Sequence, residues 1–197
     1  MANTNNWDYS YNLSSRWEGG ISKDKKDRGN QNKLGDTIYY TNTYYGLTFK
    51  AWLEYKGKDY PTTAEEFNTL NTEFSKTEKS DVKDYFKSEI WDKNNLGDIK
   101  DEKVAASIYD AMMNQGYALG GANNTTLEKV LKDLEITDYD ISTQEKAIEV
   151  LNKAIEEKGG EAVTNSYAEV REESYIKSSR KGENHAFGKG WMNRLND

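Results

Sequence analysis

Two carboxylic acids close to the N-terminus, Glu18 and Asp27, are the side chains of this sequence best suited to chemistry. Apolar residues at helical spacing precede Glu18, and Gly19-Gly20 follows it as a natural helix stop, so Glu18 is expected at the C-terminus of a helix. The negative end of the helix dipole and the neighbouring Trp17 both disfavour an ionised carboxylate there. The sequence therefore predicts that Glu18 serves as a proton donor.

Asp27 follows in a loop rich in lysine and aspartate that is closed by Gly29. Its basic neighbours Lys26 and Arg28 favour the ionised form of its carboxyl group. A protonated acid and an ionised acid across a cleft are the pair that glycosidases use. Spacing alone leaves a second interpretation open, in which Glu18 and Asp27 are a helix-end acid and a loop acid without a catalytic task.

The composition argues against most other kinds of chemistry. The 197 residues include no cysteine and one histidine, His185, which excludes thiolate catalysis, disulfides and multi-histidine metal sites. There is no glycine-rich phosphate loop, and a net charge of −7 argues against general nucleic-acid binding. We expect neither a cofactor nor a metal ion, and any catalysis should depend on carboxylates.

Several short motifs follow one another along the chain, and their order resembles glycoside hydrolase family 108. These phage-type N-acetylmuramidases carry a C-terminal peptidoglycan-binding region. The motifs are Glu18-Gly19-Gly20, Asp27-Arg28-Gly29, Thr43 to Leu47 (TYYGL), Tyr85 to Trp91, Ile108-Tyr109-Asp110 with Asn114-Gln115-Gly116, and Phe187 to Trp191 with Arg194.

This resemblance implies a lysozyme-like helical fold and cleavage of the bond that follows N-acetylmuramic acid. It also implies that Glu18 is the catalytic acid, and it makes Asp27 and Thr43 candidates to orient the attacking water. Attack by that water would invert the anomeric carbon, whereas two carboxyl groups only about 5 Å apart would indicate a retaining route. The sequence departs from the family pattern at Ile21, which replaces a tyrosine, and at Asn30, which replaces the second glycine of the turn. A longer spacer also precedes Thr43.

Two further residues are candidates for substrate binding. Tyr45, like the nearby Tyr40 and Tyr44, could stack on a sugar ring, or could pack across strands of a hairpin. Asn114 shares a helix face with Asp110 at i, i+4 and could contact an acetamido group. The more ordinary role for Asn114 is to brace the end of a helix before a glycine.

The elements that must position these residues indicate an α+β fold that is mostly α, a lysozyme-like helical domain with a small β-hairpin near residues 36–55. We expect one domain over residues 1–197, with the catalytic motifs in 1–100 and a helical peptidoglycan-binding-like region, 101–197, packed on it. Helix starts are predicted by capping signals at Thr62 with Glu65, Ser80, Asp101, Thr125 with Glu128, and Ser142 with Glu145.

The sequence as a whole predicts a peptidoglycan hydrolase of the N-acetylmuramidase (lysozyme) type, acting by general acid catalysis. One alternative is a non-catalytic wall-binding or secretion/virion-associated protein with the same fold, and another is a hydrolase of chitin. The sequence begins without a visible signal peptide and has no membrane-spanning segment. We therefore expect a monomer that is made in the cytoplasm and acts on bacterial peptidoglycan after release, as an endolysin released by a holin-type partner does.

Overall fold

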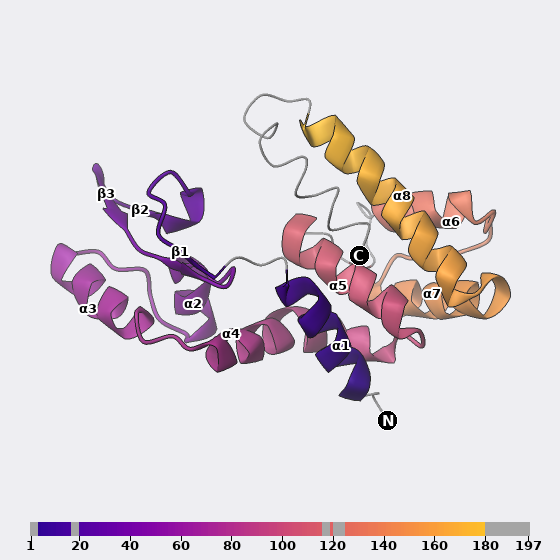
Figure 1. Cartoon of the computed structure of the whole chain (residues 1–197), viewed down its shortest axis with the longest axis horizontal. Coiled ribbons are helices and arrows are strands. Elements are labelled where there is room, and N and C mark those ends of the chain that lie inside the picture. The colour runs from indigo at the N-terminus through magenta and orange to yellow at the C-terminus, as the bar shows by residue number, and fades with distance from the viewer. Residues whose placement is uncertain (1–3, 17–19, 116–118, 120–124, 180–197) are drawn as a thin grey trace. The chain divides into compact units, whose positions relative to one another are not determined.

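A computed structural model describes residues 4–16, 20–115, 119 and 125–179 (Figure 1). The chain forms two compact units, one from residues 15–89 and the other from residues 1–14 together with 90–197. The described part is mostly helical with short antiparallel strand pairs, which confirms the predicted fold class. The expected single domain with a division at residue 100 stays a prediction.

The first unit, residues 15–89, contains two separate strand pairs. Strands β2 (Gln31–Leu34) and β3 (Thr37–Tyr40) form an antiparallel hairpin, and β1 (Ile21–Ser22) pairs with β4 (Thr43–Tyr44). At the base of the hairpin, the Thr41 amide donates a hydrogen bond to the Asn30 carbonyl oxygen at 2.9 Å. The residues that precede and follow the hairpin, Asn30 and Thr41, therefore lie next to each other.

The predicted hairpin bounds of 36–55 were wrong in two respects. The first hairpin strand lies before residue 36, and the end of the segment is a helix, α2 (Phe49–Tyr55). Thr48 caps this helix by accepting a hydrogen bond from the Ala51 amide. The aromatic residues of 49–55 had favoured a strand, but Phe49, Trp52 and Leu53 share a buried helix face instead.

Helices α3 (Ala64–Phe74) and α4 (Lys79–Phe86) complete this unit. Its core is aromatic: Phe49 packs against Phe67 and Phe74 with ring centroids 5.3 Å and 5.5 Å away. Such tilted and edge-on pairs add to the free energy gained by burial. Tyr39 of the hairpin reaches Phe67 at 4.7 Å, which ties the hairpin to this core.

The second unit gathers helices from both ends of the chain. They are α1 (Thr4–Ser15), α5 (Glu102–Gln115), α6 (Thr125–Asp133), α7 (Gln144–Lys158) and α8 (Gly160–Ser179), with a 3-10 turn at Leu96–Asp98. A π-helical turn at Lys87–Asp92 begins in the first unit and ends in the second. Helix α8 packs against α5, α6 and α7 (Figure 1). Trp7 of α1 contacts Trp91 and Tyr109, and Trp91 is a core residue.

Most helix starts lie within two residues of their predicted positions. Asp101 caps α5 as expected, by accepting hydrogen bonds from the Lys103 and Val104 amides. Three other predicted caps were wrong in register. The observed N-cap residues are Thr63 instead of Thr62, Glu78 instead of Ser80, and Thr143 instead of Ser142.

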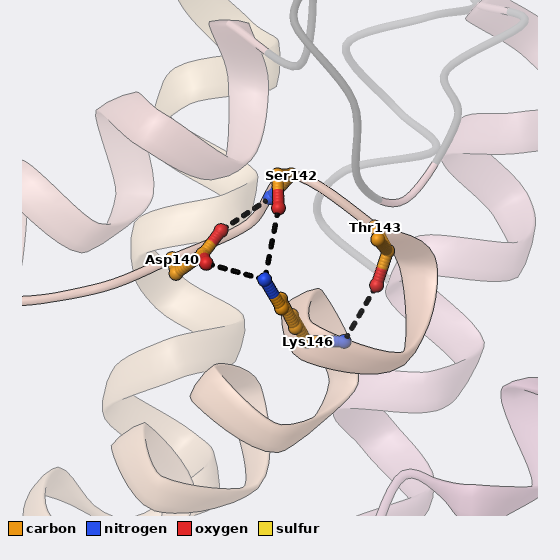
Figure 2. Close-up of polar contacts among 4 residues, drawn as sticks. All are labelled: Asp140, Ser142, Thr143 and Lys146. Carbon is orange, nitrogen blue, oxygen red and sulfur yellow. Dashed lines mark hydrogen bonds and ion pairs between the residues drawn. The ribbon is translucent and has the colours of Figure 1, made fainter.

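The start of α7 shows why such a shift occurs. Thr143 accepts the hydrogen bond from the Lys146 amide, while the preceding Ser142 accepts one from the Lys146 ammonium group (Figure 2). Asp140 accepts from that ammonium group too, at 2.6 Å, and from the Ser142 amide. Both hydroxyl residues thus bind the helix start, and only backbone geometry decides which one is the cap.

A buried ion pair joins α5 to α8 in the second unit. Arg171 donates a hydrogen bond to Asp110 at 2.6 Å, and their side chains are only 4% and 8% exposed. Asp110 also accepts from the Asn114 side chain at 3.2 Å.

None of the helices in the described ranges is both long and apolar enough to cross a membrane.

Candidate active site

Asp27 is half-buried and is held by hydrogen bonds to both of its carboxylate oxygens. It caps the 3-10 turn Arg28–Asn30, with Oδ1 accepting from the Gly29 amide at 2.9 Å. The other oxygen, Oδ2, accepts from the Ser22 hydroxyl at 2.9 Å. A carboxylate oxygen can accept more than one hydrogen bond, so both can still bind water.

Thr43 reaches the same place through strand pairing. It lies on β4, opposite Ser22 of β1, and its side chain donates a hydrogen bond to Asn30 Oδ1 at 2.8 Å. Residues far apart in sequence are therefore joined in one network, which runs from Asp27 through Ser22 and Asn30 to Thr43. Ser22, one member of this network, lies on β1, a strand of two residues that the sequence did not predict.

Gly29 lies between the two candidate water-binding residues. A Cβ atom added at Gly29 would lie 3.1 Å from Thr43 Oγ1 and 3.3 Å from Asp27 Oδ1. The two oxygens therefore flank one point above the glycine. This close approach explains why the D-R-G motif has a glycine at this position: any side chain would push on both oxygens.

Ser22 and Asn30 were not among the predicted site residues. Asn30 was noted only as a departure from a glycine, and Ser22 carried no motif. The structure places Asn30 almost fully inside, at 1% exposure, with its side chain bonded to Ser22, Asp24 and Thr43. The one signal in the sequence was a polar residue where a flexible glycine was expected.

The remaining predicted site residues have different positions. Glu18 lies outside the described residues; α1 has Ser15 as its last residue. Tyr45 is half-buried in the turn after β4, where its φ of 49° and that of Gly46, 88°, suit a tight hairpin turn. Asn114 belongs to the other unit and braces α5 by donating to the Asp110 carbonyl oxygen at 2.8 Å. The more ordinary role considered for Asn114 therefore fits its contacts.

The Asp27–Thr43 region can orient a polar molecule without a metal ion. Asp27 offers carboxylate oxygens and Thr43 a hydroxyl oxygen, and both can accept hydrogen bonds from water. Within the described ranges, no group of three or more histidine, aspartate or glutamate side chains could hold a metal ion. The chemistry available at this place is hydrogen bonding and proton acceptance.

Comparison with known families identifies the chain. Residues 12–116, more than half of its length, match the family model described as Glycosyl hydrolase 108. The chain belongs to the glycosyl hydrolase 108 family. The match includes Glu18, Asp27 and Thr43, and its end at residue 116 coincides with the end of α5 within one residue.

A solved structure supports the fold. The chain is similar to the structure of SagA from Brucella abortus, with a TM-score of 0.63 and 17% sequence identity over 98% of this chain and 91% of that one. At this identity the likeness concerns the fold alone. No curated protein matches the sequence. The chain is therefore a member of a glycoside hydrolase family with a matching overall fold.

Proposed function

We propose that this family 108 protein is an N-acetylmuramidase that cleaves the glycan strand of bacterial peptidoglycan. The observation that carries the proposal is the hydrogen-bonded cluster around Gly29, in which Asp27 and Thr43 flank the same point. These are the residues that the resemblance assigns to the attacking water. Family membership supports glycosidase chemistry, and the resemblance of the ordered motifs supports peptidoglycan as the substrate.

In the proposed reaction, Glu18 donates its proton to the leaving glycosidic oxygen as the bond to the anomeric carbon breaks. Water attacks that carbon from the opposite face and gives a proton to Asp27, so the anomeric configuration is inverted. Thr43 accepts the second hydrogen bond of the water. No metal ion or cofactor enters these steps.

The decisive experiment measures reducing ends released from purified bacterial sacculi by the wild type, Glu18→Gln and Asp27→Asn. Each substitution keeps the shape of the side chain and removes its acid–base function. We expect the Glu18→Gln rate to fall at least about 100-fold, since general acid catalysis contributes roughly that much. Equal rates for wild type and Glu18→Gln would place the chemistry elsewhere.

The stereochemistry of the product tests the role of Asp27 separately. Fresh product examined by NMR should show the inverted anomer. A retained anomer would contradict the water-positioning role, because retention requires two successive displacements at the anomeric carbon instead of one direct attack by water.

The non-catalytic alternative has one specific observation in its favour, a hollow of about 420 Å³ on the helical unit. It is lined by Lys129, Lys132 and Tyr139, together with Glu128, Ile136 and Thr137. Two lysines and a tyrosine in one lining suit a wall polymer that carries sugars and carboxylates. Binding to sacculi that is lost in Lys129→Glu/Lys132→Glu, without any release of reducing ends by the wild type, would favour a wall-binding protein.

The biological setting follows from the same proposal. An N-acetylmuramidase made in the cytoplasm must reach the wall, so we propose release by a partner pore of the holin type. A monomer is sufficient, since the proposed catalytic residues all come from one chain. Lysis of cells expressing the protein only when a pore-forming partner is supplied would support this route.

A further inference from the structure

We propose that Asn30 is a positioning residue that fixes the direction of the Thr43 hydroxyl, so that its lone pairs and not its proton face the attacking water. The inference rests on the proposed function of Asp27 and Thr43. It assigns a task to the residue at which this sequence departs from the glycine of the family motif.

The orientation of the Asn30 amide is determined by its surroundings. Its nitrogen lies 3.2 Å from the Ser22 carbonyl oxygen and 2.9 Å from the Asp24 carbonyl oxygen. Carbonyl oxygens only accept hydrogen bonds, so a flipped amide would place an oxygen against two oxygens. The amide oxygen of Asn30 must therefore be the atom that faces Thr43.

This orientation dictates the hydrogen bond of Thr43. An amide oxygen has no proton to give, so the Thr43 hydroxyl must donate to it, across 2.8 Å. The single hydroxyl proton is thereby used, and only lone pairs remain for other partners. Without Asn30 the hydroxyl could rotate and point its proton at the water instead.

The hydrogen bonds through Ser22 to Asp27 are compatible with this orientation of the Asn30 amide. The Asn30 amide nitrogen is 3.2 Å from Ser22 Oγ, and Ser22 Oγ is 2.9 Å from Asp27 Oδ2. A carboxylate can only accept, so the Ser22 hydroxyl donates its proton to Asp27 and has a lone pair left for the Asn30 amide. The directions of the bonds are consistent from Asn30 to both ends of the network.

The arrangement suits a nucleophilic water. Water that donates one proton to Asp27 and the other to Thr43 keeps both lone pairs for the anomeric carbon. A Thr43 hydroxyl turned the other way would donate to one of these lone pairs and make the water a weaker nucleophile. Asn30 does not touch the water in this scheme and acts through Thr43.

A double-mutant cycle tests the proposal on a soluble oligomer of alternating N-acetylglucosamine and N-acetylmuramic acid. The variants are Asn30→Ala, Thr43→Val and the double variant, each measured for kcat, KM and the free energy of unfolding. The matched control is Asn32→Ala. Asn32 is also buried, and its amide donates to Thr41 at 3.0 Å and to the Asn30 carbonyl oxygen at 3.3 Å.

We expect Asn30→Ala to lower kcat roughly 10- to 100-fold with little change in KM, as is typical when a group that orients an active residue is lost. In the Thr43→Val background, the same substitution should cost no more than about threefold, because its target is already gone. Asn32→Ala should retain most of the wild-type kcat. Asn30→Ser replaces Asn30→Ala if the alanine variant does not fold.

Two outcomes would overturn the inference, and they are distinguishable. In the first outcome, the loss of kcat in the double variant equals the product of the losses in Asn30→Ala and Thr43→Val, or Asn32→Ala loses as much kcat as Asn30→Ala. Either result would show that Asn30 has a structural role only. A wild type that cleaves neither the oligomer nor sacculi would overturn the proposed function itself, and the positioning role with it.

Discussion

Replacing Gly29 with alanine tests whether activity depends on the observed positions of the Asp27 and Thr43 side-chain oxygens. The added Cβ would lie 3.1 Å from Thr43 Oγ1, 3.1 Å from Thr48 Cγ2 and 3.3 Å from Asp27 Oδ1. Comfortable contacts between non-bonded atoms are about 3.5–4.0 Å, so each neighbour must move by a few tenths of an ångström.

Two opposing effects determine the change in stability. Overpacking of this kind costs about 1–3 kcal/mol. Gly29 is not among the glycines with a positive φ, so alanine can adopt its backbone conformation and restricts the unfolded chain, which returns about 0.4–1 kcal/mol. We expect a net loss of about 1 kcal/mol in the free energy of unfolding.

The loss of activity should exceed what this change in stability explains. A displacement of 1 Å at a reacting group can cost about 100-fold in rate, so shifts of a few tenths of an ångström at Asp27 and Thr43 should lower kcat about tenfold. The assay compares reducing-end release at saturating substrate with chemical denaturation of the same samples.

A second variant separates packing from chemistry. Thr48→Ser removes the methyl group that the new Cβ would meet and keeps the hydroxyl that caps α2. The Gly29→Ala/Thr48→Ser protein should therefore regain stability without regaining kcat. If Gly29→Ala alone is as active as the wild type, Asp27 and Thr43 do not have to be held in this geometry, and the reasoning fails.

Three further predictions concern the helical parts. Asp110→Ala should lower the free energy of unfolding by about 3–5 kcal/mol, because Arg171 then keeps a buried charge without this carboxylate; a loss below about 1 kcal/mol in denaturation would contradict this. The hydrogen bond from Lys146 holds the pKa of Asp140 well below its usual range, so the stabilisation is present above about pH 4 and is lost as pH falls through the lowered pKa. Lys146→Met should return that pKa toward its usual value in an NMR titration, and an unchanged pKa would exclude Lys146 as its main cause. Thr63→Ala should cost about 1 kcal/mol through loss of the α3 cap, measured by thermal unfolding.

The sequence predicted helices better than it predicted their exact first residues. Apolar periodicity over ten or more residues averages out local exceptions, so α3, α5 and α7 were located correctly. The caps at Thr62 and Ser142 were wrong by one residue because each is followed by a threonine that can accept the same kind of hydrogen bond. A choice between adjacent hydroxyl residues depends on φ and ψ, which the sequence does not specify.

Only the two ends of the hydrogen-bonded network at the candidate site, Asp27 and Thr43, could be predicted from the sequence. The order of the motifs was sufficient to name them, since each belongs to a short recognisable pattern. Ser22 and Asn30 join them through the pairing of β1 with β4, and strands of two residues leave almost no periodic signal. Their contribution depends on contacts between distant residues, which only a three-dimensional arrangement reveals.

The longer spacer before Thr43 is a departure from the family pattern, and the structure explains how the spacer is accommodated. The spacer between Gly29 and Thr43 contains the hairpin of β2 and β3, which is closed at its base by the hydrogen bond between the Thr41 amide and the Asn30 carbonyl oxygen. Because the chain returns to Asn30 before it reaches Thr43, the length of the hairpin does not determine the position of Thr43. The buried Asn32 side chain reinforces this closure by donating to Thr41. Asn30 therefore lies where the hairpin meets the candidate site, and its backbone closes the hairpin while its side chain binds Thr43. A glycine at this position could close the hairpin equally well but could not direct the threonine. Two of the three departures from the family pattern, Asn30 and the longer spacer, are therefore connected through one residue.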